Sequence, residues 1–430
     1  MKKGLIGFLS ILLVIGILAG CSGEKSSADT KEKEGKVVLN FWTFWGSETR
    51  RPIIEKIVKD FNDSQDKIEV KHTFLPWGDI WTKNLAAVAA GNPADVIVND
   101  INSVAQRAEN NQAEDLSKYL DDSFRDNFYP HLWDMVEYKG KPYAVPFNTD
   151  TRLLFYNKQA FREAGLDPNK PPRTWEELEE YAKKLDIKNG NKYERFGFYP
   201  LWGSTGPASW MASADGGKGF IHDGKLEINT PRKVEALEWL LGWQERYGEK
   251  NVQAFKAEFG SEQANPFISG KVAMIIDVGT FYTQIRDYGN GMEFGVAKIP
   301  AYDENSGNWA DGGGFVVEVP KGSKHPKEAV EFIKYLTGKE AQKYWGEKNY
   351  DNVANIEGAE AVSESLDGQA REVYEMTVDN LKETNLYPVP VEYPDYQNRI
   401  NPHIDKVFTG KQSPEEALKK AEADVKKIKK

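Results

Sequence analysis

Residues 138–158, YKGKPYAVPFNTDTRLLFYNK, contain two apolar runs separated by a short polar centre. A Gly-Lys-Pro turn precedes the first run, and the second run, residues 153–156, reads as a strand. The centre, NTDTR at residues 148–152, places Asp150 and Arg152 between the two runs. An extended segment interrupted in this way predicts that the chain crosses here from one lobe to a second.

Alternating strands and helices precede this crossing. Residues 36–42 read as a strand, residues 50–62 carry apolar side chains at helical spacing, and residues 94–98 read as a short buried strand. This order predicts an α/β fold with a largely parallel sheet. Ligands of such sheets lie outside the carboxyl ends of the strands. Five candidate binding residues fall at those ends: Trp42, Trp45, Trp77, Trp81 and Asp100.

The same alternation continues after the crossing. Capping residues open three helices, at Thr174 with Glu177, at Thr230 before Pro231, and at Ser413 before Pro414. Residues 272–277 and 293–299 read as strands. A second α/β lobe is therefore expected.

Aromatic residues are abundant, with 12 Trp, 19 Tyr and 21 Phe. Trp239 and Trp243 fit a helix pattern, which is typical of core positions. A second group lies in Gly/Pro-rich or polar surroundings, and we expect it to face a ligand: Trp202, Trp210, Trp309, Trp345 and Tyr387. Aromatic faces beside Asp, Asn and Arg suit sugars, because apolar C–H groups lie on the ring while hydroxyls bond to the polar groups.

The N-terminus explains the single cysteine of the chain. Lys2 and Lys3 precede an apolar run at residues 5–18, the layout of a secretory signal peptide. Cys21 could be incidental behind a simple cleaved signal, but LAGC at residues 18–21 resembles the lipobox of bacterial lipoproteins. That resemblance implies a signal peptide at 1–20 and a lipid on Cys21. Residues 21–35 are polar and form the expected flexible tether.

Several classes of protein are disfavoured. A net charge of -10 argues against nucleic-acid binding. The five histidines lack the spacing of zinc ligands, and residues 303–314 carry Gly314 where a calcium loop needs Glu. No phosphate-cradling or dinucleotide motif is present, so we expect neither metal nor cofactor. A pair of carboxylates suited to glycoside hydrolysis remains open, because the sequence does not give their separation.

The chain resembles the carbohydrate-binding group of bacterial extracellular solute-binding proteins of ABC importers, which includes maltose-binding protein. The matching pieces run in order along nearly the whole mature chain: LNFWTFWG (39–46), GNPADVIVND (91–100), residues 140–168 with PRTWEEL (172–178), FISGKVAMIIDVGTF (267–281), FGVAKIP (294–300), residues 312–342 and GKQSPEEALKKAEADV (410–425). The resemblance implies a two-lobed periplasmic-binding-protein-like fold with hinge crossings and a central ligand cleft. It places lobe one at 36–148 plus 296–318 and lobe two at 149–295 plus 319–430.

Site residues follow from the same resemblance. It places Asp150 and Arg152 at the first crossing, Asp277 after the GKVAMIID strand, and Gly313 at the last crossing. Relatives often carry Trp shortly after that strand, and here Phe281 replaces it.

The implied function is capture of a sugar and its delivery to an ABC permease, without catalysis. Because Trp is plentiful, we expect the sugar to be an oligosaccharide. We expect a monomer that is lipid-anchored at the outer face of the cytoplasmic membrane, with a Gram-positive bacterium preferred. The alternatives are a glycerol-phosphate or phosphodiester receptor and a surface glycoside hydrolase.

Overall fold

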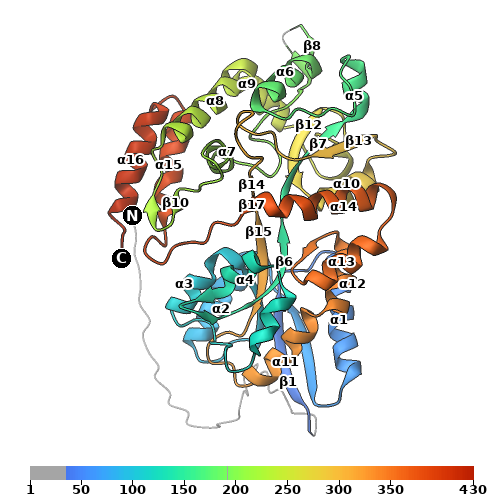
Figure 1. Ribbon diagram of the computed structural model, residues 1–430, viewed down its shortest axis with the longest axis vertical. Helices are drawn as coiled ribbons and strands as arrows, with labels where there is room; N and C mark the ends of the chain where they lie inside the picture. Colours follow the sequence, from blue (N-terminus) through green and yellow to red (C-terminus); the bar gives the residue numbers. More distant parts are fainter. Residues whose placement is uncertain (1–34, 191) are drawn as a thin grey trace, which may run out of the picture.

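The structure is a computed structural model that describes residues 35–190 and 192–430. These residues form two α/β bodies, one above the other in Figure 1, joined by extended segments. The signal peptide expected at 1–20, Cys21 with its expected lipid, and the expected tether up to residue 34 lie outside the described residues.

The first body is built on a six-stranded sheet in the order β16-β6-β15-β3-β1-β2. β1 pairs in parallel with β2 and β3, and β15 runs antiparallel to both β3 and β6. Leu39 and Phe41 of β1 are fully buried, as expected for a strand covered by helices. The strands are β1 (Val37–Thr43), β2 (Ile68–Phe74), β3 (Val96–Asp100), β6 (Val145–Asp150), β15 (Gly313–Glu318) and β16 (Asn352–Val353).

Helices with one apolar stripe cover this sheet. In α1, Ile54, Ile57, Val58 and Phe61 are buried at the spacing of one helix face. The helices of the first body are α1 (Arg50–Ser64), α2 (Asp79–Ala89), α3 (Val104–Glu109), α4 (Pro130–Val136), α11 (Pro326–Leu336), α12 (Lys339–Asn349) and α13 (Ile356–Ser365). Short 3-10 helices η1 (Ile101–Ser103) and η2 (Asp122–Asn127) lie among them.

The predicted boundary at residue 319 is wrong. α11, α12 and β16 belong to the first body, where Phe332 of α11 contacts Phe41 and Phe61 at ring-centroid distances of 5.2 and 5.1 Å. The physical reason is the direction of β15. This strand leads away from the second body, so the apolar stripe of α11 meets the nearer, first core. The chain returns to the second body only between α13 and α14 (Gly368–Asn380).

The second body has a three-stranded sheet in the order β12-β7-β13. Both pairings are antiparallel, so the expectation of a largely parallel sheet does not hold here. Leu153 to Tyr156 are buried on both faces of the central strand. The strands are β7 (Arg152–Asn157), β12 (Met274–Val278) and β13 (Phe294–Ala297).

The three capped helices predicted in this body are confirmed. Thr174 accepts from the Glu177 N–H, Thr230 accepts from the Lys233 N–H, and Ser413 accepts from the Glu416 N–H. The helices are α5 (Lys158–Glu163), α6 (Trp175–Leu185), α7 (Pro207–Ala214), α8 (Pro231–Tyr247), α9 (Glu249–Lys256), α10 (Phe281–Tyr288), α14, α15 (Tyr396–Phe408) and α16 (Pro414–Lys426), with 3-10 helices η3 (Glu262–Ala264) and η4 (Leu381–Glu383).

Three segments link the bodies. β6 continues into β7 at residue 151, β13 leads to β15 through β14 (Ala310–Asp311), and α13 leads to α14. β14 pairs with β17 (Thr384–Asn385), close to the centre of Figure 1. Other short ribbons are β4 (Glu137–Tyr138) with β5 (Lys141–Pro142), β8 (Ile187–Asn189) with β9 (Lys192–Arg195), and β10 (Ile221–His222) with β11 (Lys225–Leu226).

Candidate ligand-binding cleft

Arg152 organises the base of the space between the two bodies. Its Nη1 donates to Asp150 Oδ1 at 2.5 Å and to the Asp311 carbonyl at 2.9 Å. The backbone N–H of Gly313 donates to the same Asp150 oxygen at 3.1 Å. Burial raises the pKa of Asp150, while Arg152 acts in the opposite direction. The bonds from Arg152 to the Asp311 carbonyl and from the Gly313 N–H to Asp150 thus tie the two linking segments together.

Two hydroxyl–carboxylate pairs border Arg152 on the second body. Ser204 Oγ donates to Asp277 Oδ1 at 2.5 Å, and Ser209 Oγ of α7 donates to Asp311 Oδ2 at 3.1 Å. Burial raises the pKa of Asp277. The second oxygen of Asp311, Oδ1, is buried without a hydrogen-bond partner among the described residues. A buried acceptor left without a donor is costly, so Asp311 is poised to accept from a ligand or water.

Four aromatic rings on the first body form what we call the aromatic shelf: Phe44, Trp77, Trp81 and Phe315. Phe44 contacts Trp77 and Phe315, each at a centroid distance of 4.7 Å, and Trp77 contacts Trp81 at 4.7 Å. Trp77 keeps 61% of its surface exposed, the largest value among the exposed large hydrophobic residues. A large ring held by neighbours yet open to solvent is a ready stacking surface.

A hollow of about 420 Å³ lies beside the aromatic shelf. Trp77, Trp81, Asn84 and Asp100 line it, together with Val389 from the second body. Trp81 Nε1 and Asn84 Oδ1 are buried without a partner among the described residues. Burial also raises the pKa of Asp100, whose Oδ1 accepts from the Asn102 N–H at 2.9 Å. Apolar faces and unsatisfied polar atoms therefore meet in one place, which is typical of a small-molecule site.

A second hollow, of about 260 Å³, lies between α7 and α15. Ser209, Asp311, Tyr387 and Tyr396 line it. The Tyr387 hydroxyl donates to the Gly217 carbonyl at 2.9 Å. Gly217 has a φ of +79°, and a Cβ there would lie 2.7 Å from the Trp309 ring. Glycine at this position thus lets Trp309 approach the backbone beside Tyr387.

The segment after β17 separates the two hollows. Tyr387 lines the smaller hollow and Val389 lines the larger one. The Val389 N–H donates to the Asn102 carbonyl of the first body at 2.8 Å. The two hollows and the Arg152 base together define the cleft discussed below.

The comparisons with known proteins agree with this architecture. A family model described as bacterial extracellular solute-binding protein matches residues 45–343. The chain belongs to this family. The resemblance seen in the sequence is thereby confirmed at the level of the family.

Individual relatives of this solute-binding protein are distant. The arabinooligosaccharide-binding protein of Bacillus subtilis is 26% identical over 364 residues, which are 82% of this chain and 80% of the relative. The sn-glycerol-3-phosphate-binding periplasmic protein UgpB of Brucella melitensis is 24% identical over 404 residues, 88% and 90% of the two chains. The solved structure of CpMnBP1 with mannotriose bound is 27% identical, covers 91% of this chain and 100% of its own, and has a TM-score of 0.80.

The fold is shared more widely than the sequence. The maltose/maltodextrin-binding domain MalE of Bdellovibrio bacteriovorus, bound to maltotriose, has a TM-score of 0.71 at 19% identity. It covers 91% of this chain and 99% of its own. The two-lobed fold with a central cleft is therefore the fold of this solute-binding protein.

Five predicted site residues lie in hydrophobic cores, and their assignment to the cleft is corrected: Trp45, Trp202, Trp210, Phe281 and Trp345. Their ring faces are covered by other side chains. Trp45 packs 4.3 Å from Trp345, and Trp202 packs against Phe255 at 5.8 Å. Trp210 also has its polar partner inside the core, because its Nε1 donates to the Pro200 carbonyl at 2.8 Å.

Nine other predicted residues lie at or near the cleft: Trp77, Trp81, Asp100, Asp150, Arg152, Asp277, Trp309, Gly313 and Tyr387. Trp42 is half-buried on β1 and lines neither hollow of the cleft. Sequence reasoning missed Phe44, Phe315, Asp311, Ser204 and Ser209. Phe44 could have been found from its position, because it directly follows the carboxyl end of the first strand.

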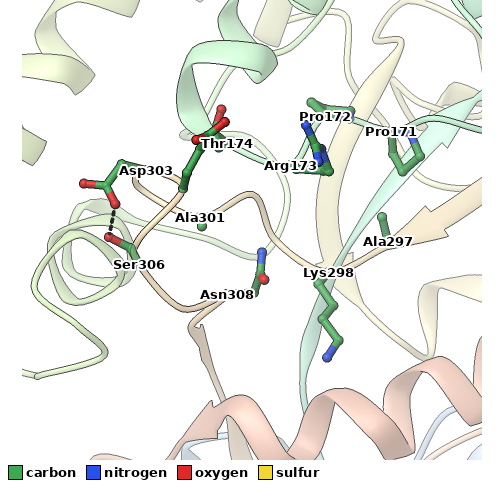
Figure 2. Close-up of a pocket in the computed structure, with 11 residues that line it drawn as sticks. Pro171, Pro172, Arg173, Thr174, Ala297, Lys298, Ala301, Asp303, Ser306 and Asn308 are labelled. Carbon is green, nitrogen blue, oxygen red and sulfur yellow. Dashed lines mark hydrogen bonds between the residues drawn. The ribbon is translucent and has the colours of Figure 1, made fainter.

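A further hollow, of about 530 Å³, borders the second body away from the cleft. Figure 2 shows its lining, which comes from the loop at residues 171–174 and the segment at 297–308. Lys298 pairs there with Glu383 at 2.9 Å, and Asp303 accepts from Ser306 at 2.8 Å. Lys298 and Asp303 are thus bonded, and no aromatic ring is among the described residues that line this hollow, so it lacks the stacking surface of the cleft.

Two further findings concern the described residues. They contain no group of three or more His, Cys, Asp or Glu side chains that could hold a metal ion. Within the same part of the chain, no helix has the length and apolar character needed to cross a membrane.

Proposed function

We propose that this protein captures a neutral oligosaccharide in the cleft and delivers it to the permease of an ABC importer, without altering it. The observation that carries the proposal is the aromatic shelf beside a hollow lined by Asn84, whose Oδ1 has no partner among the described residues. Asp311 Oδ1 is likewise without a hydrogen-bond partner in the neighbouring hollow. A sugar presents C–H faces to the rings and hydroxyl donors to those acceptors. The arabinooligosaccharide-binding and mannotriose-bound relatives support the same class of ligand.

The charge of the cleft favours a neutral ligand over glycerol phosphate. Asp150, Asp277 and Asp311 lie around Arg152, which is already paired, and Asp100 lines the larger hollow. Lys233 and Arg107 also border the hollows, but Asp215 and Glu318 hold them. A phosphate dianion would meet several carboxylates and no spare cation. The similarity to UgpB, a glycerol-3-phosphate-binding protein, is the reason to test glycerol phosphate as the second candidate ligand.

Glycoside hydrolysis is the weaker alternative. Catalysis would need one carboxylic acid and one carboxylate free to reach the scissile bond. Here Asp150 is bonded to Arg152, and Asp277 to Ser204. We therefore propose a binding role, with recovery of intact sugar as its test.

A fluorescence titration separates these candidates. The intrinsic Trp emission of the protein is followed while arabinotriose, mannotriose, maltotriose, their monosaccharides and glycerol 3-phosphate are added. Because Trp77 is exposed in the cleft, a saturable change is expected with a trisaccharide. A response to glycerol 3-phosphate alone would replace the proposal with the phosphate receptor.

The location of the protein is part of the proposal. Cleavage before Cys21 and lipidation of its thiol would tether a monomer to the outer face of the cytoplasmic membrane through residues 22–35, in a Gram-positive cell. Mass spectrometry of the N-terminal peptide checks this. The Cys21→Ser variant is expected to lose the lipid and appear in the medium. An unmodified Cys21 in the membrane fraction would contradict it.

A further inference from the structure

A third hollow lies across the linking strands from the cleft. In Figure 1, α2, α3 and α7 of the cleft are on the left of β6 and β15, whereas α1, α12 and α10 are on the right. The hollow between these three helices has a volume of about 320 Å³. Arg50 and Lys348 reach it from the first body, and Thr280, Thr283 and Arg286 reach it from the second. Both bodies therefore contribute to one site.

Cations dominate the lining of this hollow. Arg50 pairs with Asp351 at 3.1 Å, and Arg286 pairs with Asp287 at 2.6 and 2.9 Å. Within the described residues, Lys348 pairs with no carboxylate, and its ammonium group lies 5.9 Å from the centre of the Tyr344 ring. Of the residues that line the hollow, three are cationic and only Asp287 is anionic. The hollow thus carries an uncompensated positive charge.

Hydroxyl and amide groups complete the lining. Thr49 and Asn349 lie on the first body, and Thr280, Thr283 and Gln284 lie on the second. Thr283 Oγ1 donates to the Thr280 carbonyl at 2.9 Å, whereas the Thr280 hydroxyl makes no hydrogen bond among the described residues. Guanidinium, ammonium and hydroxyl donors together match the oxygens of a small tetrahedral anion.

We propose that this hollow binds a free oxyanion of phosphate or sulfate size, distinct from the ligand of the cleft. Charge-assisted bonds from Lys348 on one side and Arg286 on the other join the two bodies through the anion. Because the cleft lies on the opposite side of the linking strands, the bound anion restrains the angle between the bodies. Anion and cleft ligand are then thermodynamically linked, and each changes the affinity of the other by the same factor.

Three single substitutions test the site. The full chain is titrated with inorganic phosphate by calorimetry, at an ionic strength held constant with sodium chloride. Lys348→Gln removes the unpaired cation and is expected to weaken phosphate binding about threefold to tenfold. Asp287→Asn removes the one carboxylate that repels the anion and frees Arg286, so tighter binding is expected. Lys339→Gln, on the same helix but paired with Glu357 outside the hollow, is the matched control and leaves binding unchanged.

The outcomes are separable from those of the proposed function, because phosphate binding is read without any sugar present. No saturable heat with the unmodified chain would overturn the site. Equal losses in Lys348→Gln and Lys339→Gln would mean general charge screening and would also overturn it. An Asp287→Asn variant that binds no more tightly would contradict the contribution of the second body. Lys348 is exposed, so its substitution leaves the fold intact.

Discussion

Trp77 and Trp210 occupy similar sequence surroundings but opposite environments. Both are Trp residues next to glycine, proline and polar residues, in PWGDIW and GPASW. Trp77 is 61% exposed on the aromatic shelf, whereas Trp210 is 1% exposed among Trp175, Trp239 and Phe198. The neighbouring residues in the sequence do not determine whether the ring is exposed or buried. Trp77 is exposed because it lies beyond the carboxyl end of β2, at the edge where the sheet meets the cleft.

Removing the buried ring gives the largest expected effect. Trp210→Ala leaves a cavity among three aromatic neighbours and should lower the free energy of unfolding by about 3–5 kcal/mol. Urea denaturation followed by circular dichroism measures the change. Trp77→Ala is the matched control, and its exposed ring should alter that free energy by less than about 0.5 kcal/mol. Similar losses in both variants would abolish the distinction.

Breaking the ion pair at the base of the cleft comes next. Arg152→Met removes the charged donor of Asp150, which keeps the Gly313 N–H, and it removes the Arg152 donor of the Asp311 carbonyl. The free energy of unfolding should therefore fall by about 2–3 kcal/mol. The double variant Arg152→Met with Asp150→Asn removes the stranded carboxylate and should recover part of this loss. Strictly additive losses would show that Asp150 and Arg152 are not coupled.

The exposed Trp77 ring should contribute to ligand affinity rather than to the stability of the fold. Trp77→Ala is expected to weaken oligosaccharide binding by about 2 kcal/mol, roughly thirtyfold in Kd. Calorimetric titration gives the constant. Tyr138→Ala, at a ring outside the cleft that bonds to Glu109, provides the aromatic control and should bind normally. Equal affinities for Trp77→Ala and the unmodified protein would remove the aromatic shelf from the binding site.

The smallest effect concerns pH. Burial raises the pKa of Asp277, so the folded protein holds that proton to higher pH than the unfolded chain does. Stability from this group is therefore present at low pH and lost as pH rises from the ordinary value of 3.8 through the raised pKa. Asp277→Asn should be more stable than the unmodified protein at pH 7, with the gain shrinking towards pH 4. A gain that is independent of pH, measured by denaturation at both values, would refute this assignment.

The sequence predicts much of this architecture because local physics determines it. Capped helices at Thr174, Thr230 and Ser413 and the crossing at residues 148–152 depend on short-range contacts and follow from spacing. The return of α11 to the first core does not follow from spacing. That return depends on the direction in which β15 leaves the sheet, which is set by pairing with β3 and β6 far along the chain.

The charged residues of the candidate cleft could be predicted from the sequence better than its aromatic residues. Asp150 ends β6, Arg152 begins β7, and Asp277 lies in β12 opposite Leu153, so all three lie where the first linking segment enters the second body. Trp45 and Trp345 were misplaced because a ring beside glycine can turn inward as readily as outward. Only the fully packed neighbours, here Phe147 and the partner indole, decide the direction.

The central claim is that the cleft holds a neutral oligosaccharide intact. The most direct test is calorimetric titration of the chain from residue 22 onward with mannotriose, arabinotriose, maltotriose and glycerol 3-phosphate, followed by chromatography of the recovered ligand. Our account predicts one-site binding of at least one trisaccharide, unchanged on recovery, and no binding of glycerol 3-phosphate in the cleft. Binding of glycerol 3-phosphate that survives Lys348→Gln, with no response to any trisaccharide, or a cleaved sugar, would contradict it.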